Sequence, residues 1–227
     1  MPGQTPRQLA REETLRRIKV LALGQLAEGG AGELSLRAIA RELNLVSSAI
    51  YRYFGSREEL ITALIIDAYN DLADVLDAAA RPDRRTPLRR WREICTALRT
   101  WARQEPHRYW LIFGTAIPGY HAPQTTVAPA ARVYHALSVI GLDARPAALP
   151  SVSRELRGQL ALASDGLELA IDEPTMLVVV GSFTRVIGLI SLELGGHFVG
   201  TFEPADQLYA TLVDREGEVL GLARHEA

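Results

Sequence analysis

Apolar residues recur every three or four positions along almost the whole chain of 227 residues, and this spacing constrains the fold more than any other feature of the sequence. It places apolar side chains on one face of an α-helix, whereas a half-buried strand alternates apolar and polar residues. The chain shows no strand-like alternation of any length and no internal repeat. The sequence therefore predicts an all-α protein.

Breaks in this spacing divide the chain into successive expected helices. They cover residues 8–28, 35–43, 46–54, 57–80, 88–104, 107–117, 125–141, 151–171, 174–194 and 205–223. The helix over 57–80 has a clear apolar stripe, formed by Leu60, Leu64, Ala68, Leu72 and Leu76. We expect two domains, residues 1–62 and 63–227, with this helix continuing from the first domain to about residue 80.

Composition narrows the class of protein. Hydrophobic residues make up 48% and charged residues 23% of the chain, as in an ordinary folded protein. The first ten residues lack an apolar signal segment and the lone Cys95 cannot form an internal disulfide, so we expect a cytoplasmic protein.

The apolar run over 176–194 carries Arg185 at mid-span, where a charge costs about 2.5–3.5 kcal/mol on insertion scales. We therefore expect a buried helix there and no membrane partner.

The distribution of charge favours a nucleic-acid partner for one part of the chain. The net charge of −2 by itself argues against such a partner. Residues 1–62, however, hold nine Arg or Lys and seven Asp or Glu, a net charge of +2, whereas residues 63–227 hold sixteen and twenty, a net charge of −4. This asymmetry has the sign expected if the N-terminal part meets phosphate.

The stretch NLVSSAIYRYFGSREEL, residues 44–60, carries the strongest functional signal. At about 100° per residue, its helix has a polar side and a packing side. The polar side holds Ser47, Ser48, Tyr51 and Arg52, and the packing side holds Val46, Ala49 and Ile50. Two short helices joined by a three-residue turn form a helix-turn-helix, whose second helix fits a DNA major groove about 12 Å wide. Taken alone, the polar side also fits a merely solvated surface helix.

Two local signals support the helix-turn-helix. Asn44 tolerates the left-handed backbone that a tight turn needs. Ser56 follows Gly55 and has Glu59 three residues on, which is the pattern of a capping box that opens the helix over 57–80. The free amides at Ser56 and Arg57 then form a phosphate-binding site beside the recognition helix.

These residues resemble the tetracycline-repressor-like family of transcriptional regulators. The matching stretch is LSLRAIARELNLVSSAIYRYFGSREELITAL, residues 34–64, although Asn44 stands where the family usually has glycine and Tyr53 followed by Gly55 replaces other pairs. The resemblance implies DNA contacts for Arg37, Ser47, Ser48, Tyr51, Arg52, Tyr53 and Arg57, to which the phosphate-binding site adds Ser56. The helical phase of Tyr53 also fits burial against the helix over 8–28. Beyond residue 87 the resemblance is looser and carries over no site residue.

Aromatic residues gather in one part of the C-terminal region. Seven of the fifteen aromatic residues, including all three tryptophans, lie between positions 91 and 134. A lining of aromatic side chains with a few histidines as polar groups is typical of a ligand pocket between helices. An ordinary aromatic core has the same composition. The resemblance favours a pocket for a small apolar or amphipathic effector. Its expected lining is Trp91, Trp101, Tyr109, Trp110, Phe113, Tyr120, His121 and Tyr134.

Nothing in the sequence favours catalysis. His107, His121 and His135 are fourteen residues apart, prolines interrupt the spacing, and no acidic partner is fixed nearby. A nucleophile motif and a glycine-rich phosphate loop are both absent. We therefore expect no enzyme activity, no metal and no cofactor.

A seam of small residues runs along the helix over 174–194. Each interior glycine costs about 1 kcal/mol relative to alanine, which close contact between helices can offset. The small residues and two leucines of the last helix form an expected dimer interface: Gly181, Thr184, Gly188, Ser191, Gly195, Leu208 and Leu212. Packing within one chain is the alternative.

Taken together, the sequence predicts a homodimeric transcriptional regulator, a repressor that a small molecule releases from a pseudo-palindromic double-stranded operator. A ligand among Trp91, Trp110 and Phe113 is expected to tilt the helix over 57–80 and to change the separation of the recognition helices. The alternatives are a helical enzyme or carrier that uses the aromatic cavity, and a constitutive DNA binder without an effector.

Overall fold

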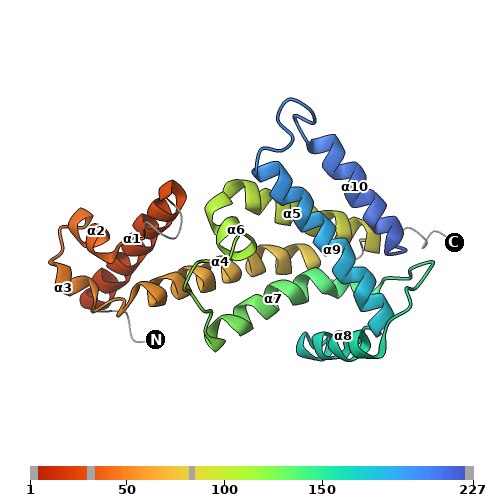
Figure 1. Ribbon diagram of the computed structural model, residues 1–227, viewed down its shortest axis with the longest axis horizontal. Helices are drawn as coiled ribbons and strands as arrows, with labels where there is room; N and C mark the ends of the chain where they lie inside the picture. Colours follow the sequence, from red (N-terminus) through yellow and green to blue (C-terminus); the bar gives the residue numbers. More distant parts are fainter. Residues whose placement is uncertain (1–4, 30–33, 82–84, 223–227) are drawn as a thin grey trace. The chain divides into compact units, whose positions relative to one another are not determined.

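The computed structural model describes residues 5–29, 34–81 and 85–222, and all regular secondary structure in these residues is helical (Figure 1). The α-helices are α1 (Pro6–Gly29), α2 (Leu36–Glu42), α3 (Ser47–Ile50), α4 (Arg57–Ala80), α5 (Pro87–Gln104), α6 (Pro106–Phe113), α7 (Val127–Ser138), α8 (Arg154–Gly166), α9 (Glu173–Leu194) and α10 (Asp206–Val219). Two short 3₁₀ helices, η2 (Gln124–Thr126) and η3 (Val139–Leu142), precede and follow α7. The predicted all-α class is confirmed.

The chain forms two compact units. The first comprises residues 1–68 and 107–126, and the second comprises residues 69–106 and 127–227. Helix α4 is continuous and contributes residues to both units. Its predicted apolar stripe is confirmed, because Leu60, Leu64, Ala68, Leu72 and Leu76 are all buried.

In the first unit, α1 supports the three elements that follow it. Ile18 and Ala22 on its inner face are fully buried. The Lys19 ammonium pairs with the Asp67 carboxylate of α4 at 2.6 Å. The Gln25 side chain accepts a hydrogen bond of 2.9 Å from the Ser35 amide at the start of α2. The helix-turn-helix is therefore anchored on α1 by both apolar and polar contacts.

In the second unit, α9 packs against α5, α7, α8 and α10. Within the described residues α9 alone is long and apolar enough, by length and composition, to cross a membrane. However, its Arg185 pairs with Glu216 of α10 at 2.6 Å, and it makes contacts with four other helices. These contacts identify α9 as a core helix of this unit.

A polar network joins α5 to α9 and α10. The Arg99 guanidinium donates to both carboxylate oxygens of Glu193 at 2.7 Å and to Asp206 at 2.8 Å, and it lies 4.7 Å from the centre of the Tyr209 ring. The hydrogen bonds to Glu193 raise the pKa of Arg99, so this cation stays charged. Cys95 is fully buried nearby, and burial raises the pKa of its thiol, as expected for a core residue that does not react.

Several predicted helix ends are wrong. Helix α3 ends at Ile50, and residues 51–53 form a turn that the sequence assigned to the helix. Helix α8 spans thirteen residues instead of 151–171, because the Ser164 hydroxyl donates to the carbonyls of Leu169 and Ile171 and folds the chain back after the helix. Helix α10 ends at Val219, whereas the expected end at residue 223 lies outside the described residues.

Candidate nucleic-acid interface and effector cavity

The turn between α2 and α3 has the geometry that the sequence predicts. Asn44 has a φ of 54°, in the left-handed region. Its amide donates to the Arg41 carbonyl at 3.0 Å, and the Leu45 amide donates to the Ala40 carbonyl at 2.8 Å. This pair of bonds is a Schellman motif, which satisfies the last carbonyls of α2 and turns the chain sharply into α3.

The polar face predicted for the recognition segment is exposed. Ser47, Ser48, Tyr51 and Arg52 all lie at the surface, and Ile50 is fully buried beneath them. One assignment is wrong: Val46, expected on the packing side, is 71% exposed. Val46 precedes the first turn of α3, where the extended backbone no longer follows the helical phase.

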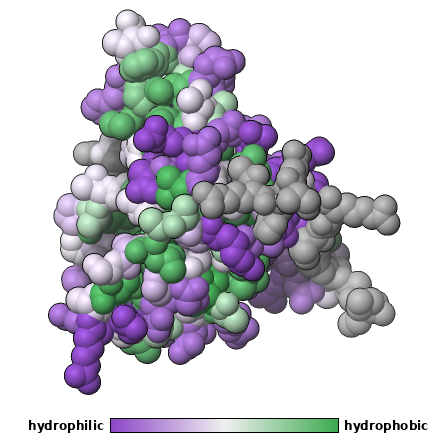
Figure 2. All heavy atoms as spheres, turned by 90° about the vertical axis from the view of Figure 1, so that its right-hand side faces the viewer, coloured by the Kyte–Doolittle hydropathy of each residue, from purple (hydrophilic) through white to green (hydrophobic). Residues whose placement is uncertain are grey.

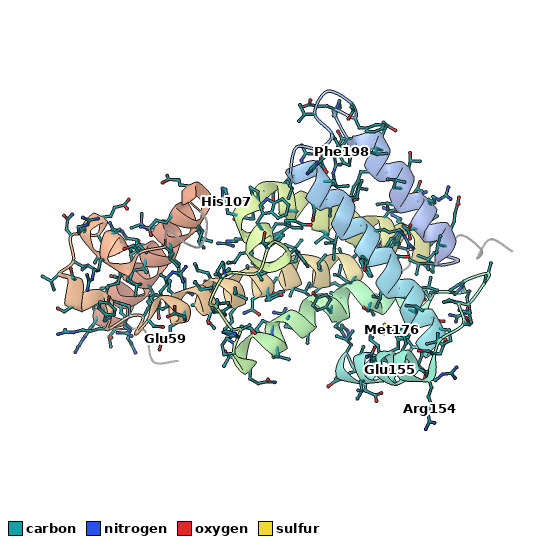
Figure 3. All side chains as sticks on the ribbon, viewed as in Figure 1. Glu59, His107, Arg154, Glu155, Met176 and Phe198 are labelled. Carbon is teal, nitrogen blue, oxygen red and sulfur yellow. The ribbon has the colours of Figure 1, made fainter. Side chains whose placement is uncertain are left out.

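The start of α4 is capped by Ser56 as predicted, but the carboxylate that should complete the capping box bonds the amide one residue before the cap. The Ser56 hydroxyl accepts from the Glu59 amide at 3.1 Å, and the Glu59 carboxylate accepts from the Gly55 amide at 2.7 Å. Glu59 is labelled at this end of α4 in Figure 3. Arg57 is partly exposed beside it and approaches Glu58 at 3.8 Å. A phosphate at this helix end would meet a positive dipole and a guanidinium.

Two other predicted contact residues differ in their surroundings. Arg37 on α2 is exposed. Tyr53 is partly buried, and the Arg11 guanidinium of α1 lies 5.2 Å from the centre of its ring. Tyr53 thus contacts α1, as the alternative drawn from its helical phase anticipated, and its contact with DNA stays a prediction.

A capped turn, an exposed face of hydroxyl and guanidinium groups on the second helix and the turn that follows it, and a phosphate-binding helix end define a helix-turn-helix DNA-binding protein. Two family models match the chain. That of the bacterial regulatory proteins of the tetR family matches residues 20–64, and that of the tetracyclin repressor-like C-terminal domain matches residues 91–215. The chain belongs to the tetracycline-repressor family and is a DNA-binding transcriptional regulator.

Similar proteins agree with this assignment. An HTH-type transcriptional regulator of Mycobacterium tuberculosis is 38% identical over 206 residues, which cover 83% of this chain and 84% of that regulator. A regulator of Mycobacterium bovis matches to the same extent. The crystal structure of the regulatory protein SCO4313 has 33% identity and a TM-score of 0.78 and covers 93% of this chain and 98% of its own. A TetR-like transcriptional regulator from Rhodococcus sp. RHA1, 18% identical with a TM-score of 0.55, covers 93% of this chain and 97% of its own and shows likeness of fold alone.

The structure divides the eight residues of the expected effector pocket between the two units. Trp91, Trp101 and Tyr134 belong to the second unit, and the other five belong to the first. Trp91 and Trp101 are buried, and their indole N–H groups donate to the Val213 carbonyl at 2.7 Å and to Asp71 at 2.8 Å. The structure therefore does not gather all eight residues within one unit, and the complete set stays a prediction.

The first unit contains a cavity of about 370 Å³ that includes one of these aromatic residues. Its volume lies in the range of small-molecule sites, about 300–1,000 Å³. The cavity lies between the end of α1, helix α6 and the loop after α6, and its lining is Leu26, Ala27, His107, Trp110, Leu111 and residues 114–118. His107 is labelled in Figure 3. The lining is mainly apolar and includes the imidazole of His107 and the indole of Trp110. The described residues hold no cluster of metal-ligating side chains.

A contact that the sequence did not predict connects this region to α4. The hydroxyl groups of Tyr120 and Thr62 are hydrogen-bonded at 2.9 Å, and both belong to the first unit. Tyr120 follows the loop that lines the cavity, and Thr62 lies six residues after the cap of α4. No local pattern identifies Thr62, because its partner is 58 residues away in the sequence.

The expected dimer face is open in the second unit. Thr184 is exposed, Gly181 and Gly188 are partly exposed on the same side of α9, and Leu212 on α10 is 37% exposed. A methyl group added at Gly188 would meet no atom within 4 Å. Gly195 has another role, because it is the C-cap of α9. Figure 2 shows apolar patches among hydrophilic residues on the α10 side of this unit, including one at the height of the α9–α10 loop.

Proposed function

We propose that the protein is a homodimeric, cytoplasmic repressor that a small apolar or amphipathic molecule releases from a pseudo-palindromic operator. The observation that carries the proposal is the position of the cavity. It lies in the same compact unit as the helix-turn-helix, and its loop is followed by the hydrogen bond between Tyr120 and Thr62 of α4. A ligand that moves this loop would act on the helix whose first turn meets phosphate.

The lining of the cavity indicates the class of effector. Leu26, Leu111 and Ile117 offer apolar contact, whereas His107 and Thr115 offer hydrogen bonds. Such a lining suits a largely apolar molecule with one or two polar groups. A fold neighbour, a TetR variant from Acinetobacter baumannii AYE that is 15% identical with a TM-score of 0.51, was solved in complex with minocycline.

Replacing Arg52 with alanine is expected to weaken binding to a specific operator and to change base preference at one position. Arg52 lies in the turn directly after α3. An arginine in the major groove can donate two hydrogen bonds to a guanine edge, a contact that contributes about 1–3 kcal/mol to discrimination. Mobility shift with an operator and with duplexes substituted at single base pairs measures both effects.

Arg57→Ala is the matched control for a phosphate contact. This substitution should weaken all duplexes alike and lower the salt dependence of binding, because a phosphate contact carries no base preference. Unchanged binding by both variants would contradict the assignment of this face to DNA.

An effector should quench the fluorescence of Trp110 and lower operator affinity. Trp110 is 38% exposed at the cavity, whereas Trp91 and Trp101 are buried, so Trp110→Phe should remove most of the quenching. A hundredfold loss of operator affinity corresponds to a coupling free energy of about 2.7 kcal/mol, and by linkage the operator must weaken ligand binding equally. Titration of an apolar compound library, with and without operator, measures both affinities.

Two variants separate binding from coupling. Ala116→Trp should fill the cavity and abolish the response while DNA binding persists, since Ala116 lines the cavity. Tyr120→Phe should retain both binding events but reduce their coupling, because it removes the hydroxyl that contacts Thr62. Ligands that quench Trp110 without altering DNA affinity would instead indicate a carrier or a constitutive DNA binder.

A further inference from the structure

The residue that precedes α3 makes no side-chain cap bond, a feature that it shares with Ala205 before α10. Six of the described helices begin after a side chain that accepts a hydrogen bond from the amide three residues on; these caps are Thr5, Ser35, Ser56, Thr86, Ser153 and Asp172. The corresponding residue of α3 is Val46, which has an extended backbone and makes no side-chain cap bond. Valine is among the least favoured residues at this position. A side-chain cap bond therefore does not account for Val46.

The Val46 side chain is also unusually exposed for an apolar group. At 71% it exceeds the other large apolar side chains that the described first unit exposes, such as Val20 at 55% and Leu9 at 50%. Single exposed apolar residues are common on protein surfaces. Val46, however, stands directly before Ser47, on the segment whose N-terminal residues contact base edges when a recognition helix enters the major groove.

We propose that Val46 is a specificity-determining residue that packs against the C5 methyl group of a thymine in the operator. An isopropyl group forms no hydrogen bond, and the thymine methyl is the apolar group that base pairs present in the major groove. Cytosine lacks this methyl, so the contact favours thymine at one position of each half-site. The inference rests on the proposed binding of a specific operator.

Deoxyuridine provides the test, because it keeps the hydrogen-bonding edge of thymine and lacks only the methyl group. The probe is the tightest duplex that the wild-type protein selects from a random pool, with each thymine replaced singly. At one thymine position of each half-site, we expect the deoxyuridine replacement to weaken wild-type binding roughly fourfold. This is the effect of losing the burial of one methylene-sized group. Val46→Ser should bind the thymine and deoxyuridine duplexes equally at that position.

The variants keep folding separate from recognition. Serine is a favoured N-cap, so Val46→Ser should unfold at the same temperature as the wild type or higher. Val46→Ala removes two methyl groups without gaining a cap and should lower the discrimination. Val20→Ser, which changes an exposed valine of α1, should retain the wild-type preference for thymine.

Two results would overturn the inference: a wild-type protein indifferent to every single deoxyuridine, or a Val46→Ser variant that still discriminates as the wild type does. Failure of the wild type to select any duplex is a distinct result. It would contradict the proposed operator binding and, with it, the contact assigned to Val46.

Discussion

Replacing Trp91 with alanine is expected to lower the free energy of unfolding by about 3–5 kcal/mol, the range for truncating a buried aromatic side chain. Trp91 is fully buried, and its ring meets the Phe183 ring of α9 edge-on at 5.1 Å between centroids. Its indole N–H donates to the Val213 carbonyl of α10 at 2.7 Å. Alanine would leave a cavity between three helices and remove the indole hydrogen bond to the Val213 carbonyl. Urea denaturation followed by circular dichroism measures the loss.

Trp91→Phe is the matched control, because it keeps most of the apolar volume and removes the N–H donor. We expect it to cost less than the alanine variant. The pair also decides between core and pocket, the two interpretations that the sequence left open for Trp91. An alanine variant that keeps native stability but loses ligand binding would place Trp91 in a pocket and contradict its assignment to the core.

The parts of the fold that depend on local physics could be predicted from the sequence. The stripe from Leu60 to Leu76 follows from helical periodicity, and all five of its residues are buried. The turn at Asn44 and the cap at Ser56 follow from the conformational and hydrogen-bonding preferences of single residues. These local features position the helix-turn-helix, which explains why the DNA-binding segment could be identified without a structure.

The parts that depend on distant contacts could not be predicted. Helical phase alone placed Val46 on the packing side, but phase has no meaning for a residue that precedes the helix. The sequence groups eight residues into one expected pocket, whereas Trp91 and Trp110 belong to different compact units, and the complete pocket stays a prediction. The Tyr120–Thr62 hydrogen bond likewise depends on how a distant segment folds onto α4 within the first unit.

Replacing Gly188 with leucine is expected to convert the proposed dimer into monomers. A methyl group added at Gly188 meets no atom within 4 Å, so the isolated chain has room for a side chain there. Leucine is also a better helix former than glycine, which costs about 0.8–1 kcal/mol relative to alanine, so the fold should not weaken. Only a partner packed closely against this side of α9 would be displaced. Sedimentation velocity measures the change in mass, and thermal unfolding verifies the fold.

Loss of the dimer should weaken operator binding by roughly 10²–10⁴-fold, because a monomer binds one half-site and loses the effective concentration of its tethered neighbour. The half-site centres of the wild-type footprint should lie one or more helical turns apart, about 34–36 Å per turn. Gly24→Leu is the control, since Gly24 on α1 is equally open but lies in the first unit, and this variant should stay dimeric. A Gly188→Leu protein that sediments as an unchanged dimer would place the interface elsewhere on the chain, because leucine cannot fit a seam in which helices approach as closely as glycine allows.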